Sequence, residues 1–83
     1  MKKVIIYSTR ICPYCVRAKN FFNKKNIDYT EIMIDQNPSL IKEMVEKSGR
    51  QSVPQIFIDD YHVGGFDDLI EHDMDGKLED LLF

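Results

Sequence analysis

Two cysteines separated by two residues, Cys12 and Cys15, constrain this chain more than any other feature of its sequence. An apolar, partly β-branched run at residues 4–7 precedes them and predicts a strand, and a segment with helical periodicity follows. Pro13 suits the first position of a helix, where its missing N–H costs nothing, so we expect Cys12 at the N-cap. A Cys-x-x-Cys pair at such a strand-to-helix turn indicates a redox site.

The rest of the sequence alternates strand and helix signals. Residues 29–34 alternate polar and apolar side chains, so the first two strands are predicted to be parallel with a right-handed crossover. Residues 55–58 and 61–63 predict a hairpin with a tight turn at Asp59 and Asp60. The order βαβαββα predicts an α/β fold, a four-stranded mixed sheet with helices on both faces.

Helices are predicted between and after these strands. The first follows Cys12, and Asn26 is expected to end it in a left-handed conformation. The second begins after Asn37 and ends at Gly49, and a short helix at residues 66–72 precedes a last turn or two. The side chains expected to face the core are Ala18, Phe21, Phe22, Leu40, Ile41, Met44 and Val45, with Tyr14 as a further candidate.

Length and composition bound the function. The chain has 83 residues, 43% of them hydrophobic and 30% charged, which predicts one globular domain over residues 1–83. Its net charge of −3 argues against nucleic-acid binding, although residues 1–27 carry seven bases and no acid. No apolar stretch reaches the roughly 18 residues that span a bilayer, and the N-terminal run is too short for a secretory signal. We therefore expect a cytoplasmic protein, where cysteine pairs are usually catalytic or metal-bound.

The two cysteines have different predicted environments. An N-cap residue faces the free N–H groups and the positive dipole end of its helix, which favour a thiolate at Cys12. Arg10, two residues earlier, is expected to add a cation there. Cys15 lies one turn deeper, within disulfide range of Cys12, and should stay protonated. We predict that Cys12 is the attacking nucleophile and Cys15 the resolving thiol.

Other uses of the cysteines fit less well. A zinc site normally needs four protein ligands, and the only histidines, His62 and His72, lie ten residues apart on a predicted strand and a predicted helix. No histidine is placed to act as the base of a cysteine protease, so both are expected to be surface or packing residues. A permanent structural disulfide disagrees with a cytoplasmic location. Redox exchange is the favoured chemistry, with no metal site and no bound cofactor.

Over essentially its whole length the chain resembles the dithiol bacterial glutaredoxins, which have a thioredoxin-like fold. Three motifs carry the resemblance: Cys12-Pro13-Tyr14-Cys15, Ser52-Val53-Pro54-Gln55-Ile56-Phe57 and Gly64-Gly65-Phe66-Asp67-Asp68. Many relatives have a lysine three residues before the nucleophile, where this chain has Thr9.

The resemblance implies a glutathione-binding site. In similar proteins the proline that corresponds to Pro54 is cis, and Val53 offers its backbone N–H and C=O to the glutathione peptide. The N–H groups of Asp67 and Asp68 are implied to bind the γ-glutamyl carboxylate, and the Asp67 side chain its ammonium. The full implied set is Arg10, Tyr14, Arg50, Gln51, Val53, Pro54, Gly65, Phe66, Asp67 and Asp68, with Arg10 replacing the usual lysine and Arg50 or Gln51 meeting the glycine carboxylate.

The sequence therefore predicts a glutathione-dependent thiol–disulfide oxidoreductase that reduces protein disulfides and glutathione mixed disulfides. Its expected partners are glutathione and disulfide-containing or glutathionylated proteins, with ribonucleotide reductase as the family's example, and we expect a monomer that binds neither nucleic acid nor membrane. Two alternatives stay open: a redoxin reduced by thioredoxin reductase, and an iron–sulfur cluster carrier. Cys15 and Pro13 count against the carrier, which is more typical of monothiol relatives.

Overall fold

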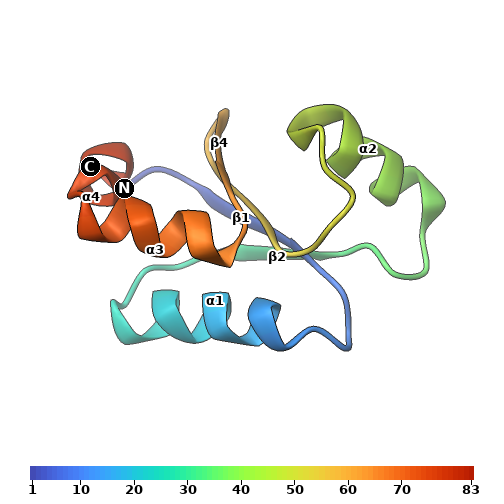
Figure 1. The fold of residues 1–83 in the computed structure, drawn as a ribbon, viewed down its shortest axis with the longest axis horizontal. Coiled ribbons are helices and arrows are strands. Elements are labelled where there is room, and N and C mark those ends of the chain that lie inside the picture. Colours follow the sequence, from blue (N-terminus) through green and yellow to red (C-terminus); the bar gives the residue numbers. More distant parts are fainter.

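Four strands form one mixed sheet at the centre of the computed structural model, which describes all residues, 1–83. They are β1 (Val4–Ser8), β2 (Thr30–Met33), β3 (Gln55–Ile58) and β4 (Tyr61–Gly64), arranged in the order β2-β1-β3-β4 (Figure 1). β1 pairs with β2 in parallel and with β3 antiparallel, and β3 and β4 form the predicted hairpin. The predicted α/β fold is confirmed.

Helices cover both faces of this sheet. α1 (Pro13–Lys24), α3 (Phe66–Met74) and α4 (Lys77–Leu82) pack on one face, and α2 (Pro38–Ser48) packs on the other. The backbone N–H of Lys2 donates to the carbonyl of Leu82 at 3.0 Å, which joins the N-terminal segment to the end of α4. Figure 1 accordingly shows the two chain ends side by side, at the opposite end of α1 from its start.

The helix boundaries follow the signals in the sequence. α1 begins at Pro13 and α2 at Pro38, each after an extended N-cap residue. At α2 the Asn37 side chain accepts a hydrogen bond from the backbone N–H of Ser39 at 3.1 Å, which satisfies one of the free helical donors. Gly49, with a φ of 71°, ends α2 as predicted.

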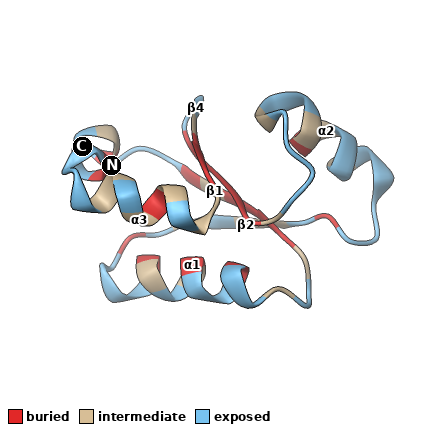
Figure 2. Ribbon diagram, in the orientation of Figure 1, coloured by how far each residue is buried: buried red, intermediate tan, exposed pale blue.

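Alternation along β1 places side chains in two separate cores. Val4 and Ile6 face α1 and α3, whereas Tyr7 faces α2 together with Met44 and Phe57. Figure 2 shows the buried residues concentrated along the central strands and the inner faces of the helices. The Tyr7 hydroxyl donates to Glu43 of α2 at 2.7 Å; burial and this hydrogen bond raise the pKa of Tyr7 to about 12.

The first strand is one residue longer than predicted. It was expected over residues 4–7, but Ser8 also belongs to β1 and is fully buried. Its carbonyl accepts from the N–H of Ile34 at 3.0 Å, and its hydroxyl donates to Glu31 at 2.6 Å, so the polar groups are satisfied inside the sheet. The pKa of Glu31 is lowered mainly by the hydrogen bond from Lys19 and secondly by that from Ser8.

Two side chains predicted to face the core are exposed. Ile41 is 40% exposed and Tyr14 51% exposed. On α2 the fully buried Met44 defines the inner face, and Leu40 lies four residues before it on the same face. Ile41 is one residue further round the helix, about 100° away, so it falls at the edge of that face. The helix predicted at residues 66–72 also extends further, to Met74.

We expect Leu69→Ala to lower the free energy of unfolding by about 2–5 kcal/mol, because Leu69 is fully buried where α3 packs on the sheet. The matched control, Ile41→Ala, should cost less than about 1 kcal/mol, because its side chain is already partly in water. Urea unfolding followed by circular dichroism measures both. Equal losses would contradict the burial of these two residues.

Candidate active site

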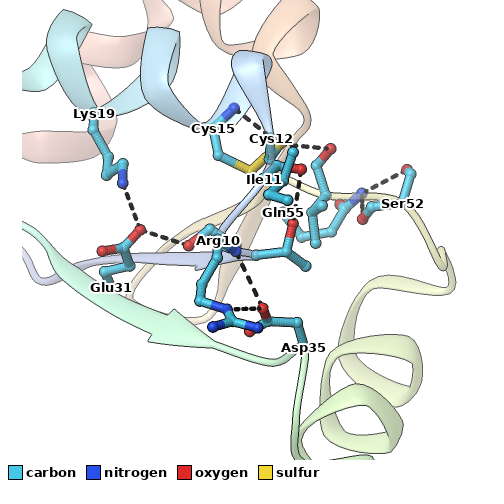
Figure 3. The surroundings of a disulfide bond; sticks show 12 residues. Arg10, Ile11, Cys12, Cys15, Lys19, Glu31, Asp35, Ser52 and Gln55 are labelled. Carbon is cyan, nitrogen blue, oxygen red and sulfur yellow. Dashed lines mark hydrogen bonds and ion pairs between the residues drawn. A yellow bond between two sulfur atoms is a disulfide. The ribbon is translucent and has the colours of Figure 1, made fainter.

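The two cysteines form a disulfide at the start of α1, and their environments differ (Figure 3). Cys12 is the N-cap residue and is partly exposed, whereas Cys15 lies in the first turn and is fully buried. The Cα atoms are 5.2 Å apart, within the range that a disulfide requires. Only Cys12 can meet another molecule without movement of the helix.

The sulfur of Cys12 lies where a thiolate would be stabilised. It accepts a hydrogen bond from the backbone N–H of Cys15 at 3.1 Å, as an N-cap side chain does, at the positive end of the dipole of α1. It is also 3.8 Å from the carbonyl oxygen of Val53, on the loop before β3. The N-cap position predicted for Cys12 is confirmed, and the contact to Val53 connects the sulfur to a second segment.

Buried polar side chains hold the Val53 loop. The Val53–Pro54 peptide bond is cis, as the resemblance implied. The side chain of Gln55, fully buried at the start of β3, donates to the carbonyl of Ser52 at 3.0 Å. Its Oε1 lies 2.7 Å from Nε2 of His62 on β4. Burial first, and the charge of Arg50 second, lower the pKa of His62, so the neutral ring can donate this hydrogen bond from Nε2.

An open groove of about 340 Å³ lies beside this loop, between it and the start of α3. That volume lies within the usual ~300–1,000 Å³ range of small-molecule sites. Eight of the ten residues that the sequence analysis assigned to glutathione line the groove. These are Tyr14, Arg50, Val53, Pro54, Gly65, Phe66, Asp67 and Asp68, and Ser52 joins them.

Asp68 and Arg50 form the charged part of the groove. Asp68 Oδ2 accepts from Nη1 of Arg50 and from the backbone N–H of Gly65, both at 2.9 Å. These two hydrogen bonds, that of Arg50 being the stronger cause, lower the pKa of Asp68. Gly64 has a φ of 115°, and a Cβ there would collide with the Asp68 carboxylate, so this turn requires glycine.

An aromatic pair forms another part of the wall. The ring centroids of Tyr14 on α1 and Phe66 on α3 are 6.2 Å apart, and the guanidinium of Arg17 lies 5.0 Å from the Tyr14 centroid. The exposure of Tyr14 therefore has a structural reason, because its ring packs across the groove and not into the core. The groove combines an apolar wall, a charged end and the backbone of the Val53 loop.

Known proteins are similar to this chain in sequence. A profile of the Glutaredoxin family matches residues 4–63. The Glutaredoxin of Pseudomonas aeruginosa and Glutaredoxin 3 of Escherichia coli K12 are each 48% identical over 82 residues, which cover 99% of this chain and 98% and 99% of theirs. The chain belongs to the glutaredoxin family. It is a thiol–disulfide oxidoreductase, as the sequence predicted.

Solved glutaredoxin structures agree with the fold. The solution structure of the Brucella melitensis glutaredoxin is 49% identical, has a TM-score of 0.85 and matches 99% of this chain and 89% of its own. A crystal structure of a buckwheat glutaredoxin–glutathione complex is 31% identical, has a TM-score of 0.88 and matches 98% of this chain and 76% of its own. No helix of the present glutaredoxin is long and apolar enough to cross a membrane.

Arg10 and Gln51 do not line the groove of this glutaredoxin. The backbone N–H and Nε of Arg10 both bond to Oδ2 of Asp35, at 3.3 and 3.1 Å, and Figure 3 shows its side chain turned toward that carboxylate. Arg10 was expected to act as the cation beside Cys12, but its charge is paired with Asp35 instead. Gln51 is exposed next to Arg50.

Three residues that support the site were not predicted. Ser52, Gln55 and His62 connect β4 to the loop that contacts Cys12. The one signal for this network in the sequence is Gln55 itself. An amide that begins an otherwise apolar strand must find hydrogen-bond partners when it is buried. His62 was expected at the surface or in packing; its ring packs against Phe57, with centroids 4.9 Å apart.

The pairing of Asp68 with Arg50 predicts how the stability contributed by Asp68 depends on pH. Because the folded-state pKa lies below the ordinary value of 3.8, the stabilisation is present above that value and is lost as pH falls through the folded-state pKa. We expect Arg50→Ala to raise the Asp68 pKa, as measured by NMR of its carboxyl carbon. Arg17→Ala, which removes a guanidinium that does not contact Asp68, should leave it unchanged. The opposite pattern would contradict the assigned cause.

His62→Leu should destabilise the protein by about 1–3 kcal/mol, because Gln55 Oε1 would be buried without a donor. The matched control is Tyr61→Phe, on the same strand as His62, which removes an exposed hydrogen bond between Tyr61 and His72 of α3. That change should cost about 0.5 kcal/mol or less. Urea unfolding gives both values. If His62→Leu lost no more stability than Tyr61→Phe, the hydrogen bonds of Ser52, Gln55 and His62 would not support the Val53 loop.

Proposed function

We propose that Cys12 is the nucleophile of this glutaredoxin and that Cys15 resolves the intermediate it forms. In the reduced protein the Cys12 thiolate attacks one sulfur of a substrate disulfide, and the other substrate sulfur leaves as a thiolate. With a protein disulfide, Cys15 then attacks the Cys12 sulfur, which closes the Cys12–Cys15 bond and releases the second substrate thiol. Two glutathione molecules reduce that bond and leave as glutathione disulfide.

The position of Cys12 beside the groove is the observation that carries this proposal. Its sulfur lies 3.8 Å from the Val53 carbonyl, and Val53 lines the groove. A glutathione whose peptide backbone pairs with Val53 would therefore bring its own sulfur next to Cys12. Pairing of this kind adds a short extended peptide to exposed backbone groups, which gives affinity without demanding a particular side chain.

The two ends of glutathione fit the two ends of the groove. The first N–H groups of α3, at Phe66, Asp67 and Asp68, have no partner within the helix, and they favour a carboxylate. We assign the γ-glutamyl carboxylate there, with its ammonium on the exposed side chain of Asp67. Arg50 is assigned to the glycine carboxylate; it would then exchange part of its contact with Asp68 for the ligand.

With a glutathionylated protein, Cys12 alone completes the reaction. Its thiolate takes the glutathione half, the protein leaves as a thiol, and a second glutathione releases the first as glutathione disulfide. Glutaredoxin potentials of about −200 to −230 mV lie close to the glutathione poise of the cytosol, so the Cys12–Cys15 bond can be formed and reduced there. We accordingly propose a cytoplasmic monomer with one domain over residues 1–83, acting on disulfide-containing and glutathionylated proteins.

Two cysteine variants test this assignment. Cys12→Ser should abolish turnover of both a protein disulfide and the mixed disulfide of cysteine with glutathione. Cys15→Ser should lose the protein disulfide reaction but keep the mixed disulfide reaction, because that reaction needs no resolving thiol. Coupled assays of glutathione disulfide production measure both. Activity retained by Cys12→Ser would overturn the assignment.

The reductant distinguishes this proposal from its alternatives. We expect glutathione to support turnover of the wild-type protein and thioredoxin reductase to fail. The reverse result would favour a redoxin reduced by thioredoxin reductase. A brown, dimeric species after anaerobic treatment with iron and sulfide would instead favour an iron–sulfur carrier.

A further inference from the structure

Two large apolar side chains next to Cys12 are exposed and lie outside the groove. Ile11, the residue before the nucleophile, is 93% exposed, and Val16 on α1 is 48% exposed. Neither lines the groove that we assign to glutathione. Figure 3 shows Ile11 directly beside Cys12. An isoleucine this exposed leaves nearly its whole apolar surface in water, which is unfavourable unless a partner covers it.

The backbone around Ile11 is held in place. Immediately before it, Arg10 is fixed to Asp35 through both its backbone N–H and its side chain. The Ile11 carbonyl accepts from the Thr9 hydroxyl at 3.4 Å. Immediately after it, Cys12 caps α1. Ile11 is therefore presented at a defined position next to the reacting sulfur.

Val16 approaches Cys12 from the helix. Its N–H donates to the Cys12 carbonyl at 3.1 Å, and the two residues are four apart, so their side chains lie on one face of α1. Ile11 and Val16 thus flank Cys12 from the loop side and the helix side. We call these two residues the Ile11–Val16 surface. The nearby guanidinium of Arg17 has no carboxylate within ion-pair distance.

The reaction determines what meets this surface. A glutathionylated protein has two halves joined by one disulfide, and the groove beside Val53 and Phe66 is the part of the site that we assign to the glutathione half. The protein half must remain outside the groove while its cysteine is bonded to the glutathione sulfur. The residues next to that cysteine are then within reach of the residues next to Cys12, which are exposed and apolar.

We propose that the Ile11–Val16 surface selects glutathionylated proteins that have a large apolar residue beside the modified cysteine. The inference rests on the proposed function, because it needs glutathione in the groove and Cys12 as nucleophile. The bond formed joins the Cys12 and glutathione sulfurs, and the bond broken joins glutathione to the protein. The protein sulfur leaves as a thiolate and takes a proton from water. Ile11 touches the leaving segment and determines specificity.

Mixed disulfides of glutathione with two short, net-negative peptides test the proposal. The peptides differ only at the residues on either side of cysteine, which are leucine in one and serine in the other. Wild-type protein should have a kcat/KM about fivefold higher for the leucine peptide than for the serine peptide. This ratio is smaller than the discrimination reached by a closed apolar pocket, because the Ile11–Val16 surface stays partly open to water. The preference should appear mainly in KM.

Ile11→Ser should bring the ratio between the two peptides close to one, and Ile11→Leu should restore it. Both variants should turn over the mixed disulfide of cysteine with glutathione at the wild-type rate, because that substrate has no flanking residues. Met74→Ser, which removes an 80% exposed side chain at the end of α3, is the matched control and should change nothing.

A wild-type ratio near one, or an unchanged ratio in Ile11→Ser, would overturn the proposal while leaving the proposed function intact. Failure of the wild-type protein on the cysteine–glutathione mixed disulfide would instead remove the proposed function, and the inference with it.

Discussion

The N–H group of Cys15 donates to the sulfur of Cys12 at 3.1 Å, and the proposed role of Cys12 as nucleophile depends on this contact. It exists because Pro13 starts α1 one residue after Cys12, so that a sulfur takes the N-cap place usually filled by an oxygen. The same geometry points the helix dipole at Cys12 and leaves Cys15 inside the first turn. One helix start thereby places two identical residues in unlike environments.

Charged side chains in the groove beside this sulfur are paired with each other. Arg50 and Asp68 neutralise each other, and the backbone N–H of Gly65 also donates to the Asp68 carboxylate. In the proposed complex a ligand carboxylate replaces part of the contact between Arg50 and Asp68. The exposed carboxylate of Asp67 is the group that we assign to the ligand ammonium.

Local signals in the sequence were sufficient for most of the fold. Proline and asparagine at the helix starts, and glycine at the end of α2, act within a few residues, so the boundaries at Pro13, Pro38 and Gly49 could be predicted. Ile41 was misplaced because helical periodicity gives the apolar face only to within about one residue. Ser8 was misplaced because a buried serine depends on partners in another strand.

The site was predictable where a motif kept its parts adjacent and less so where the partners lie far apart in the chain. The Val53 and Gly65 segments could be assigned through their resemblance to glutaredoxins, and they do line one groove. The side chain of Arg10 pairs with Asp35, which is 25 residues later in the chain. The two residues are neighbours only because β1 and β2 are parallel. The link between Gln55 and His62 likewise requires the hairpin register.

The backbone hydrogen bond from Lys2 to Leu82 holds the two ends of the chain together. The ends meet at the far end of α1 from its start, where the disulfide lies (Figure 1), so a short peptide linker could join them there. Closely spaced termini of this kind are what circular permutation exploits. New ends could then be opened at the exposed turn of Asp59 and Asp60, and the sheet order would be preserved. For the same reason, a domain attached at either terminus would extend away from the reacting sulfur.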